Sequence, residues 1–126
     1  MSTSSTTPIL EVPQTSAGRF VIIATIKAKD EASATRLESL IVACRDFALS
    51  SAAPTCHTYR TVRSLDKKNG VVTFVIFEEW DTTPDTLQTY FESDAIQEWN
   101  KALKEENLLA EPWEEPPPFY EEFIRK

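Results

Sequence analysis

The sequence predicts an α+β domain of the ferredoxin-like class, with the order β-α-β-β-α-β and a four-stranded antiparallel sheet. Residues 20–26 and 71–80 are apolar, β-branched runs of strand length. Residues 34–48 instead place apolar side chains at helical spacing. A turn containing Asn69-Gly70 stands before the second apolar run. A chain of 126 residues has room for one such domain.

The first strand and the first helix follow one another closely. Residues 20–26 are apolar on both faces, which predicts a central strand. Asp30 can cap the helix that follows, because its carboxylate can accept from free backbone N–H groups. Apolar residues then recur at intervals of three and four as far as Ala48, with charged residues on the other side. Pro54 disfavours helix at Ala53, so the helix is expected to have ended there.

Residues 55–63 and 71–80 are expected to form a β-hairpin around a turn at 66–70. Under strict alternation, His57 and Tyr59 would point to the same face of the first of these strands. The hairpin register cannot be fixed from the sequence, because the length of the loop is ambiguous.

The second helix is expected in two pieces. Thr83-Pro84 is a helix-start pattern, and Ser93 can restart a helix after a short interruption. Prolines at 116–118 then break the chain. Residues 119–124 alternate in character, which predicts a last strand at an edge of the sheet.

One face of this sheet is expected to lie open. The helices can cover only one face, yet the strands at 20–26 and 71–80 are apolar on both. A second copy of the chain is the simplest cover, so a homodimer is expected. The Ser-, Thr- and Pro-containing residues 1–17 are predicted to be a disordered arm before a domain at 18–126.

Composition limits the partners and the compartment. The formal net charge is −7, with the acidic excess late in the chain and no basic stripe, so nucleic acid and anionic membranes are not expected partners. Cys44 and Cys56 form no disulfide framework, and no leader or membrane span is recognised, which favours the cytoplasm. Two glycines cannot build a phosphate loop, and no cluster has metal-ligand spacing, so no cofactor and no metal are expected.

Three stretches have a familiar combination and order. Arg19–Ile26 opens the domain, Pro54–Tyr59 begins the second strand, and Phe77–Trp80, followed by Leu87–Ser93, closes the third. Together they resemble the antibiotic-biosynthesis monooxygenase (ABM) family of dimeric α+β barrels, over roughly residues 19–124. The chain departs from the family pattern at Thr55, where glycine is usual, and at Tyr90, where a helix histidine is frequent.

This resemblance implies a range of activities. The family includes cofactor-free oxygenases of polyketide anthrones and phenols, relatives that cyclise, decarboxylate or isomerise, and members without known activity. Its haem-degrading branch uses a helix histidine as iron ligand. His57 is the only histidine and falls on a strand, so haem degradation is not expected.

The candidate catalytic residues are His57, Tyr59 and Tyr90. An imidazole can act as a base near neutral pH, so His57 can take a proton from a phenol or an enolisable carbon. The two tyrosines can orient a substrate oxygen by hydrogen bonding. The alternative is structural, with a histidine satisfied by a backbone carbonyl or at a dimer seam and tyrosines in the aromatic core.

Five aromatic residues are candidates for the walls of a pocket for a planar, hydrophobic substrate: Phe47, Phe74, Trp80, Phe91 and Trp99. Glu78 and Glu79 face opposite sides of one strand, so only one can be inward, and it would need Arg60 or Arg63 as partner. The favoured interpretation is a salt bridge at the rim.

The sequence therefore predicts a cofactor-independent monooxygenase-like enzyme acting on an aromatic polyketide or a similar hydrophobic phenol. A decarboxylase, cyclase or dehydratase could use the same residues, because each stabilises an enolate. A non-catalytic dimeric binding or accessory protein is the alternative from another class. Its pocket would be filled by the aromatic side chains themselves.

Overall fold

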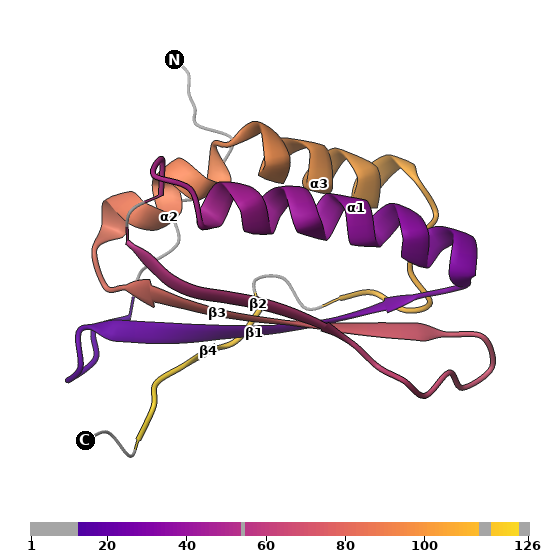
Figure 1. Cartoon of the computed structure of the whole chain (residues 1–126), viewed down its shortest axis with the longest axis horizontal. Coiled ribbons are helices and arrows are strands. Elements are labelled where there is room, and N and C mark those ends of the chain that lie inside the picture. The colour runs from indigo at the N-terminus through magenta and orange to yellow at the C-terminus, as the bar shows by residue number, and fades with distance from the viewer. Residues whose placement is uncertain (1–12, 54, 114–116, 124–126) are drawn as a thin grey trace.

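The structure, a computed structural model, describes residues 13–53, 55–113 and 117–123. It has two layers, with the helices on one face of a four-stranded antiparallel sheet (Figure 1). The elements, in chain order, are β1 (Arg19–Ala28), α1 (Glu31–Ala48), β2 (Cys56–Arg63), β3 (Val72–Asp81), α2 (Pro84–Phe91), α3 (Asp94–Glu105) and β4 (Phe119–Tyr120). The sheet order is β2-β3-β1-β4, which confirms the ferredoxin-like prediction.

The predicted central strand is confirmed, because β1 lies between β3 and β4. It pairs with β3 along its whole length, from Arg19 opposite Asp81 to Ala28 opposite Val72. The even-numbered side chains of both strands face the helices and are buried. Their apolar members form one core with the inner faces of the helices.

Side-chain caps fix where two of the helices begin. The Asp30 carboxylate accepts from the backbone N–H of Ser33, as predicted for α1. The Ser93 hydroxyl accepts from the backbone N–H of Ile96, so the second helix is split into α2 and α3 where the sequence predicts it. Thr83 makes no side-chain capping bond, and α2 begins at the proline that follows it.

The turn of the β2–β3 hairpin uses the two residues predicted for it. Asn69 and Gly70 have positive φ angles of 57° and 77°. The backbone N–H of Val71 donates to the carbonyl of Lys68, which closes the turn around them. Asparagine and glycine are the residues that tolerate this left-handed backbone.

The predicted strict alternation along β2 is wrong at its start. The β2–β3 register shifts between Cys56 and Thr58, so that Cys56 lies opposite Trp80 and Tyr59 opposite Glu78. Trp80 and Glu78 both face the helices, and Cys56 and Tyr59 therefore share that face. A bulge adds one residue to a strand and resets its alternation, which here leaves His57 off the face that Tyr59 occupies.

The last strand is shorter than predicted. Of the described residues in the predicted strand at 119–124, Phe119 and Tyr120 pair with β1, opposite Ile22 and Val21. The Phe119 ring packs on Phe20 with centroids 5.3 Å apart, which anchors this short edge strand. Residues 121–123 are exposed and make no ladder with β1, and Ile124 lies outside the described residues.

The face of the sheet away from the helices carries an apolar patch formed by Ile23, Val62, Val75 and Phe77. Their register places them together, because Ile23 lies opposite Phe77 and Val62 opposite Val75. Phe77 is 38% exposed and Val62 is 51% exposed.

No described helix is long and apolar enough to cross a membrane.

The predicted N-terminal arm is described only in part, because residues 1–12 lie outside the described residues. Gln14 donates through its side chain to the carbonyl of Thr82. The Thr15 hydroxyl bonds the backbone of Arg19, next to a turn in which Gly18 has a φ of 74°. The chain is thus attached to the sheet a few residues before the predicted domain boundary.

Candidate functional site

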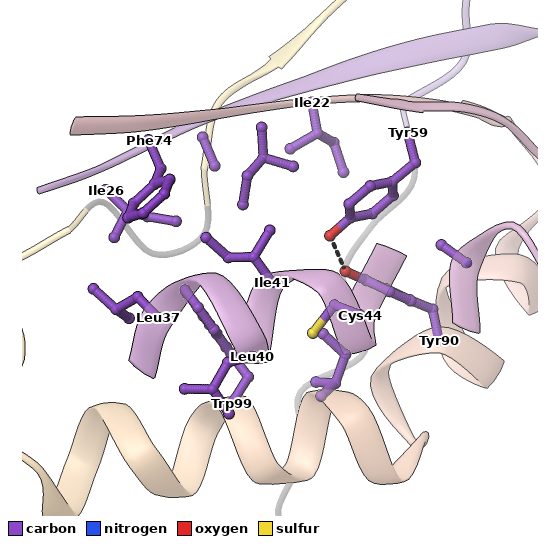
Figure 2. Packing of buried hydrophobic residues seen from close by; sticks show 14 of the residues in the cluster. Ile22, Ile26, Leu37, Leu40, Ile41, Cys44, Tyr59, Phe74, Tyr90 and Trp99 are labelled. Carbon is purple, nitrogen blue, oxygen red and sulfur yellow. Dashed lines mark hydrogen bonds between the residues drawn. The ribbon is translucent and has the colours of Figure 1, made fainter. Parts of the chain in front are cut away.

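Two buried tyrosines meet between the sheet and the helices. The hydroxyl oxygens of Tyr59, on β2, and Tyr90, on α2, are 2.8 Å apart (Figure 2). Tyr59 reaches this position because the bulge turns it toward the helices. Tyr90 lies one helical turn after the buried Leu87, on the inner side of α2. Two of the three predicted catalytic residues are therefore in direct contact.

Three of the five predicted pocket walls surround this tyrosine pair. Tyr90 has its ring centroid 5.0 Å from that of Trp80, 5.7 Å from Phe91 and 6.5 Å from Phe47. These separations are those of packed aromatic pairs. Trp80 is completely buried and belongs to the aromatic shell around the hydroxyls.

The other two predicted walls lie elsewhere in the core. Phe74 lies near Ile26, away from Tyr59 (Figure 2), with the Arg63 guanidinium 5.8 Å from its ring centroid. Trp99, on α3, packs perpendicular to Trp113 with centroids 5.8 Å apart. The structure does not bring these two residues to the tyrosine pair.

Glu78 is the acidic residue of this region. It lies on β3 between Tyr59 and Ile22 of the neighbouring strands, and it is only 6% exposed. The indole Nε1 of Trp80 donates to its Oε1 over 2.9 Å. Burial raises the pKa of the Glu78 carboxyl to about 7, against the opposing effect of the Trp80 hydrogen bond.

The neighbouring titratable groups are held in their neutral forms. Burial raises the pKa of the Cys44 and Cys56 thiols to about 12, and the Glu78 charge adds to the effect. Burial, with Glu78 again contributing, also raises the pKa of Tyr59 and of Tyr90 well above the usual value for a phenol. Of these five groups, only the Glu78 carboxyl changes charge near neutral pH.

The sequence interpretation missed Glu78. A rim salt bridge is correct for Glu79, which has Arg19 at 3.7 Å, but it is wrong for its neighbour. The expected partners, Arg60 or Arg63, do not pair with Glu78, which is bonded to an indole instead. The sequence did indicate this burial. Glu78 lies two residues before the buried Trp80 on β3, and alternation places both side chains on the same face.

His57 lies apart from the tyrosine pair. Its Nε2 is 2.5 Å from Oδ1 of Asp81, at the end of β3, and its side chain is partly exposed. Asp81 follows Trp80 and so faces away from the helices. A carboxylate on one ring nitrogen fixes the orientation and tautomer of the imidazole, which is how histidine bases are held in enzymes.

A groove of about 260 Å³ opens between α1 and the edge strand β2. Its lining is mixed in character and consists of Glu38, Ile41, Val42, Arg45, Thr61, Val62, Arg63 and Phe74. Cys44 is the next inward residue of α1 after Ile41, and Tyr59 is the residue of β2 before Thr61 on the same face. The lining thus includes the inward neighbours of Cys44 and Tyr59 along these two elements, but neither tyrosine of the pair.

No group of three or more His, Cys, Asp or Glu side chains within residues 13–53, 55–113 and 117–123 is arranged to hold a metal ion. Cys44 and Cys56 are both free thiols. Between the layers, the described residues contribute hydroxyls, thiols, the Trp80 indole and the Glu78 carboxyl. Such groups can exchange hydrogen bonds and protons with an organic ligand.

The fold and this buried cluster define a ferredoxin-like α+β domain with polar groups between its layers. The profile of the antibiotic biosynthesis monooxygenase family matches residues 19–102. The match covers more than half of the chain, and the chain belongs to this family, which confirms the resemblance found in the sequence. No curated protein matches the chain.

Solved structures agree on the fold. A provisionally named antibiotic biosynthesis monooxygenase from Caulobacter crescentus has a TM-score of 0.62 at 20% identity, covering 81% of this chain and 87% of that one. Another with that provisional name, from Nitrosomonas europaea, has a TM-score of 0.64 at 14% identity, covering 84% and 91%. A Mycobacterium tuberculosis protein has a TM-score of 0.63 at 19% identity, covering 85% and 97%. At these identities the likeness is one of fold.

Proposed function

We propose that this protein is a cofactor-independent, monooxygenase-like enzyme of the cytoplasm, acting on an aromatic polyketide or a related hydrophobic phenol. The observation that carries the proposal is the buried Tyr59–Tyr90 hydroxyl pair, enclosed by aromatic rings, with a groove further along α1 and β2. Family membership supports the reaction class. The aromatic rings around the pair and the phenolic donors support the proposed substrate class.

Each part has a proposed role in this reaction. A planar substrate enters along the groove, and the hydroxyls of Tyr59 and Tyr90 hold its oxygen by hydrogen bonds. Trp80, Phe47 and Phe91 exclude water, which strengthens those hydrogen bonds. Removal of a proton gives a phenolate or enolate, whose electron-rich carbon can react with dioxygen without a metal or flavin.

His57 is the base proposed from the sequence, and its contact with Asp81 supports that role. Because it lies off the face of Tyr59, it would take a proton from a part of the substrate at the bulge end of β2, and not from the oxygen held by the two tyrosines. His57→Ala should lower turnover about a hundredfold or more while the fold is kept. Asp81→Asn keeps the imidazole without its carboxylate, and should give a smaller loss. Unchanged oxygen uptake by His57→Ala removes this residue from the mechanism.

We also propose that the patch of Ile23, Val62, Val75 and Phe77 is covered by a second copy of the chain. A sheet face with exposed apolar side chains gains free energy when it is removed from water. Two such faces packed together would leave the helices of both copies outside, as the resemblance to dimeric α+β barrels implies. The substrate sites would then lie within each protomer.

Two alternatives remain within the proposal. A decarboxylase, cyclase or dehydratase could use the same hydroxyls to stabilise an enolate. A non-catalytic binding or accessory protein is favoured by one observation, namely that Trp80 and Tyr90 are packed with Phe47 and leave no exposed surface at Trp80.

The deciding experiment is an oxygen-electrode assay of the purified protein, freed of metal and flavin, against a panel of anthrones and phenolic acids. The enzyme proposal expects oxygen uptake with at least one anthrone, and substrate loss without uptake assigns one of the other reactions. Binding of panel members without any conversion assigns the accessory role.

A further inference from the structure

Glu78 is enclosed by neutral groups from every element around it. Those that titrate come from three elements: Cys56 and Tyr59 from β2, Cys44 from α1 and Tyr90 from α2. β1 contributes the apolar Ile22, and β3 contributes the Trp80 indole. None of these residues is a cation.

A buried carboxylate without a cation is unfavourable, and proteins usually avoid it or use it. The carboxyl of Glu78 has one neutral hydrogen-bond donor, Trp80 Nε1, within the described part of the chain. A hydrophobic side chain at this position would complete the core made by Phe74, Ile76 and Trp80 on the same face. A buried carboxyl at this position therefore points to a chemical role.

We propose that Glu78 is a catalytic residue that accepts the proton of a phenol or enol bound at the Tyr59–Tyr90 pair. This inference rests on the proposed function, because it requires a substrate at that site. The O–H bond of the ligand breaks, its proton passes to a carboxylate oxygen of Glu78, and the electron pair stays on the ligand oxygen. The tyrosine hydroxyls donate to the resulting anion, and the net charge of the site does not change.

The position of Glu78 suits this transfer. It lies directly across the strand pair from Tyr59, on the same face, so a ligand oxygen at the tyrosine hydroxyls is on its side of the sheet. With a pKa of about 7, the carboxyl is about three pKa units below a simple phenol, instead of about six for an exposed glutamate. Proton transfer is correspondingly less unfavourable.

His57 cannot substitute for Glu78 at this place, because the bulge and its bond to Asp81 hold it off the Tyr59 face. The two residues therefore make different predictions for the same ligand. Transfer to Glu78 produces a protonated carboxyl group, which has its own infrared C=O band. Transfer to His57 does not.

The test uses the full chain and 2-naphthol, a planar phenol whose anion absorbs at longer wavelength than its neutral form. The wild-type protein is first titrated alone by infrared difference spectroscopy, and one carboxyl band should titrate near pH 7. 2-Naphthol is then added about one unit above that pH, where Glu78 is mostly ionised and the free probe is neutral. Wild type should gain both naphtholate absorbance and a protonated carboxyl band.

Glu78→Gln should lose both changes, and Glu79→Gln is the matched control that should keep them. Naphtholate formation in Glu78→Gln equal to that in wild type overturns the proposal, as does failure of wild type to bind the probe. If Glu78→Gln does not fold, the titration of wild type alone decides, because the absence of a carboxyl band near neutral pH also overturns it. Proton transfer without oxygen uptake from any anthrone overturns the oxygenase proposal and leaves the role of Glu78 intact.

Discussion

Glu78→Gln should change the pH dependence of stability in a direction that only a buried acid produces. The pKa of Glu78 is raised from 4.5 to about 7 in the folded protein. Below the lower value the carboxyl is protonated in both states and has no effect on the pH dependence. Between the two values the unfolded chain loses this proton while the folded protein keeps it, so the free energy of unfolding falls as pH rises.

The magnitude follows from the size of the shift. A difference of about 2.5 pKa units corresponds to about 3 kcal/mol of stability lost by the wild type between about pH 4 and pH 8. Glutamine does not titrate and keeps a carbonyl acceptor for Trp80 Nε1, but its amide brings new donors that cost about 1 kcal/mol if poorly bonded. The variant should thus be about 1 kcal/mol less stable than wild type near pH 4 and about 2 kcal/mol more stable near pH 8.

Urea unfolding of both proteins at several pH values measures this difference directly, because other titrating groups contribute equally to both and cancel. Glu79→Gln is the matched control, since Glu79 faces the other side of the sheet and is paired with Arg19. It should show no comparable gain with rising pH. A stability difference between wild type and Glu78→Gln that stays constant from about pH 4 to pH 8 would refute the burial argument.

Three further outcomes are expected from the same structure. Tyr90→Phe removes one of two bonded hydroxyls, and should lower the free energy of unfolding by about 1–2 kcal/mol in urea titrations; no loss would mean that the Tyr59 hydroxyl finds another partner. Phe77→Asp puts a charge into the proposed dimer face, and should move the protein from dimer to monomer in analytical ultracentrifugation, whereas an unchanged dimer would place the interface elsewhere. Thr61→Trp fills the groove, and should slow 2-naphthol association about tenfold or more in stopped-flow fluorescence while thermal unfolding is unchanged; an equal association rate would exclude the groove as the entrance.

Much of the fold follows from local chemistry in the sequence. The apolar run at 20–26 has no polar face, which is why the central position of β1 was predictable. Asp30 and Ser93 cap helices where their side chains predict it, and Asn69-Gly70 forms the hairpin turn. These features depend on residues close in sequence, so they can be predicted from one sequence alone.

The candidate site depends on a β-bulge that the sequence does not predict. The bulge between Cys56 and Thr58 adds a residue to β2, and nothing in the local sequence marks it. One added residue reverses every side chain before it relative to those after it. His57 was therefore grouped with Tyr59, while the structure pairs it with Asp81.

The remaining differences concern distance and burial. Phe74 and Trp99 are buried aromatics, and Phe74 lines the groove, but alternation cannot say which end of a sheet or which helix will meet the tyrosines. The sequence interpretation places Glu78 at the rim because of its charge, whereas its spacing of two residues from Trp80 on β3 places it on the buried face. An ionisable residue on the buried face is the more informative observation, because burial of a carboxyl costs free energy and such residues gather at functional sites.

The central claim is that the groups between the sheet and the helices perform an oxygenation without a cofactor. Incubation of the metal- and flavin-free protein with an anthrone under isotopically labelled dioxygen, followed by mass spectrometry of the product, tests it most directly. Wild type should place one labelled oxygen atom in the product, and Glu78→Gln should form this product about a hundredfold or more slowly. A product without label, or one formed only after flavin or metal is added, would contradict this claim.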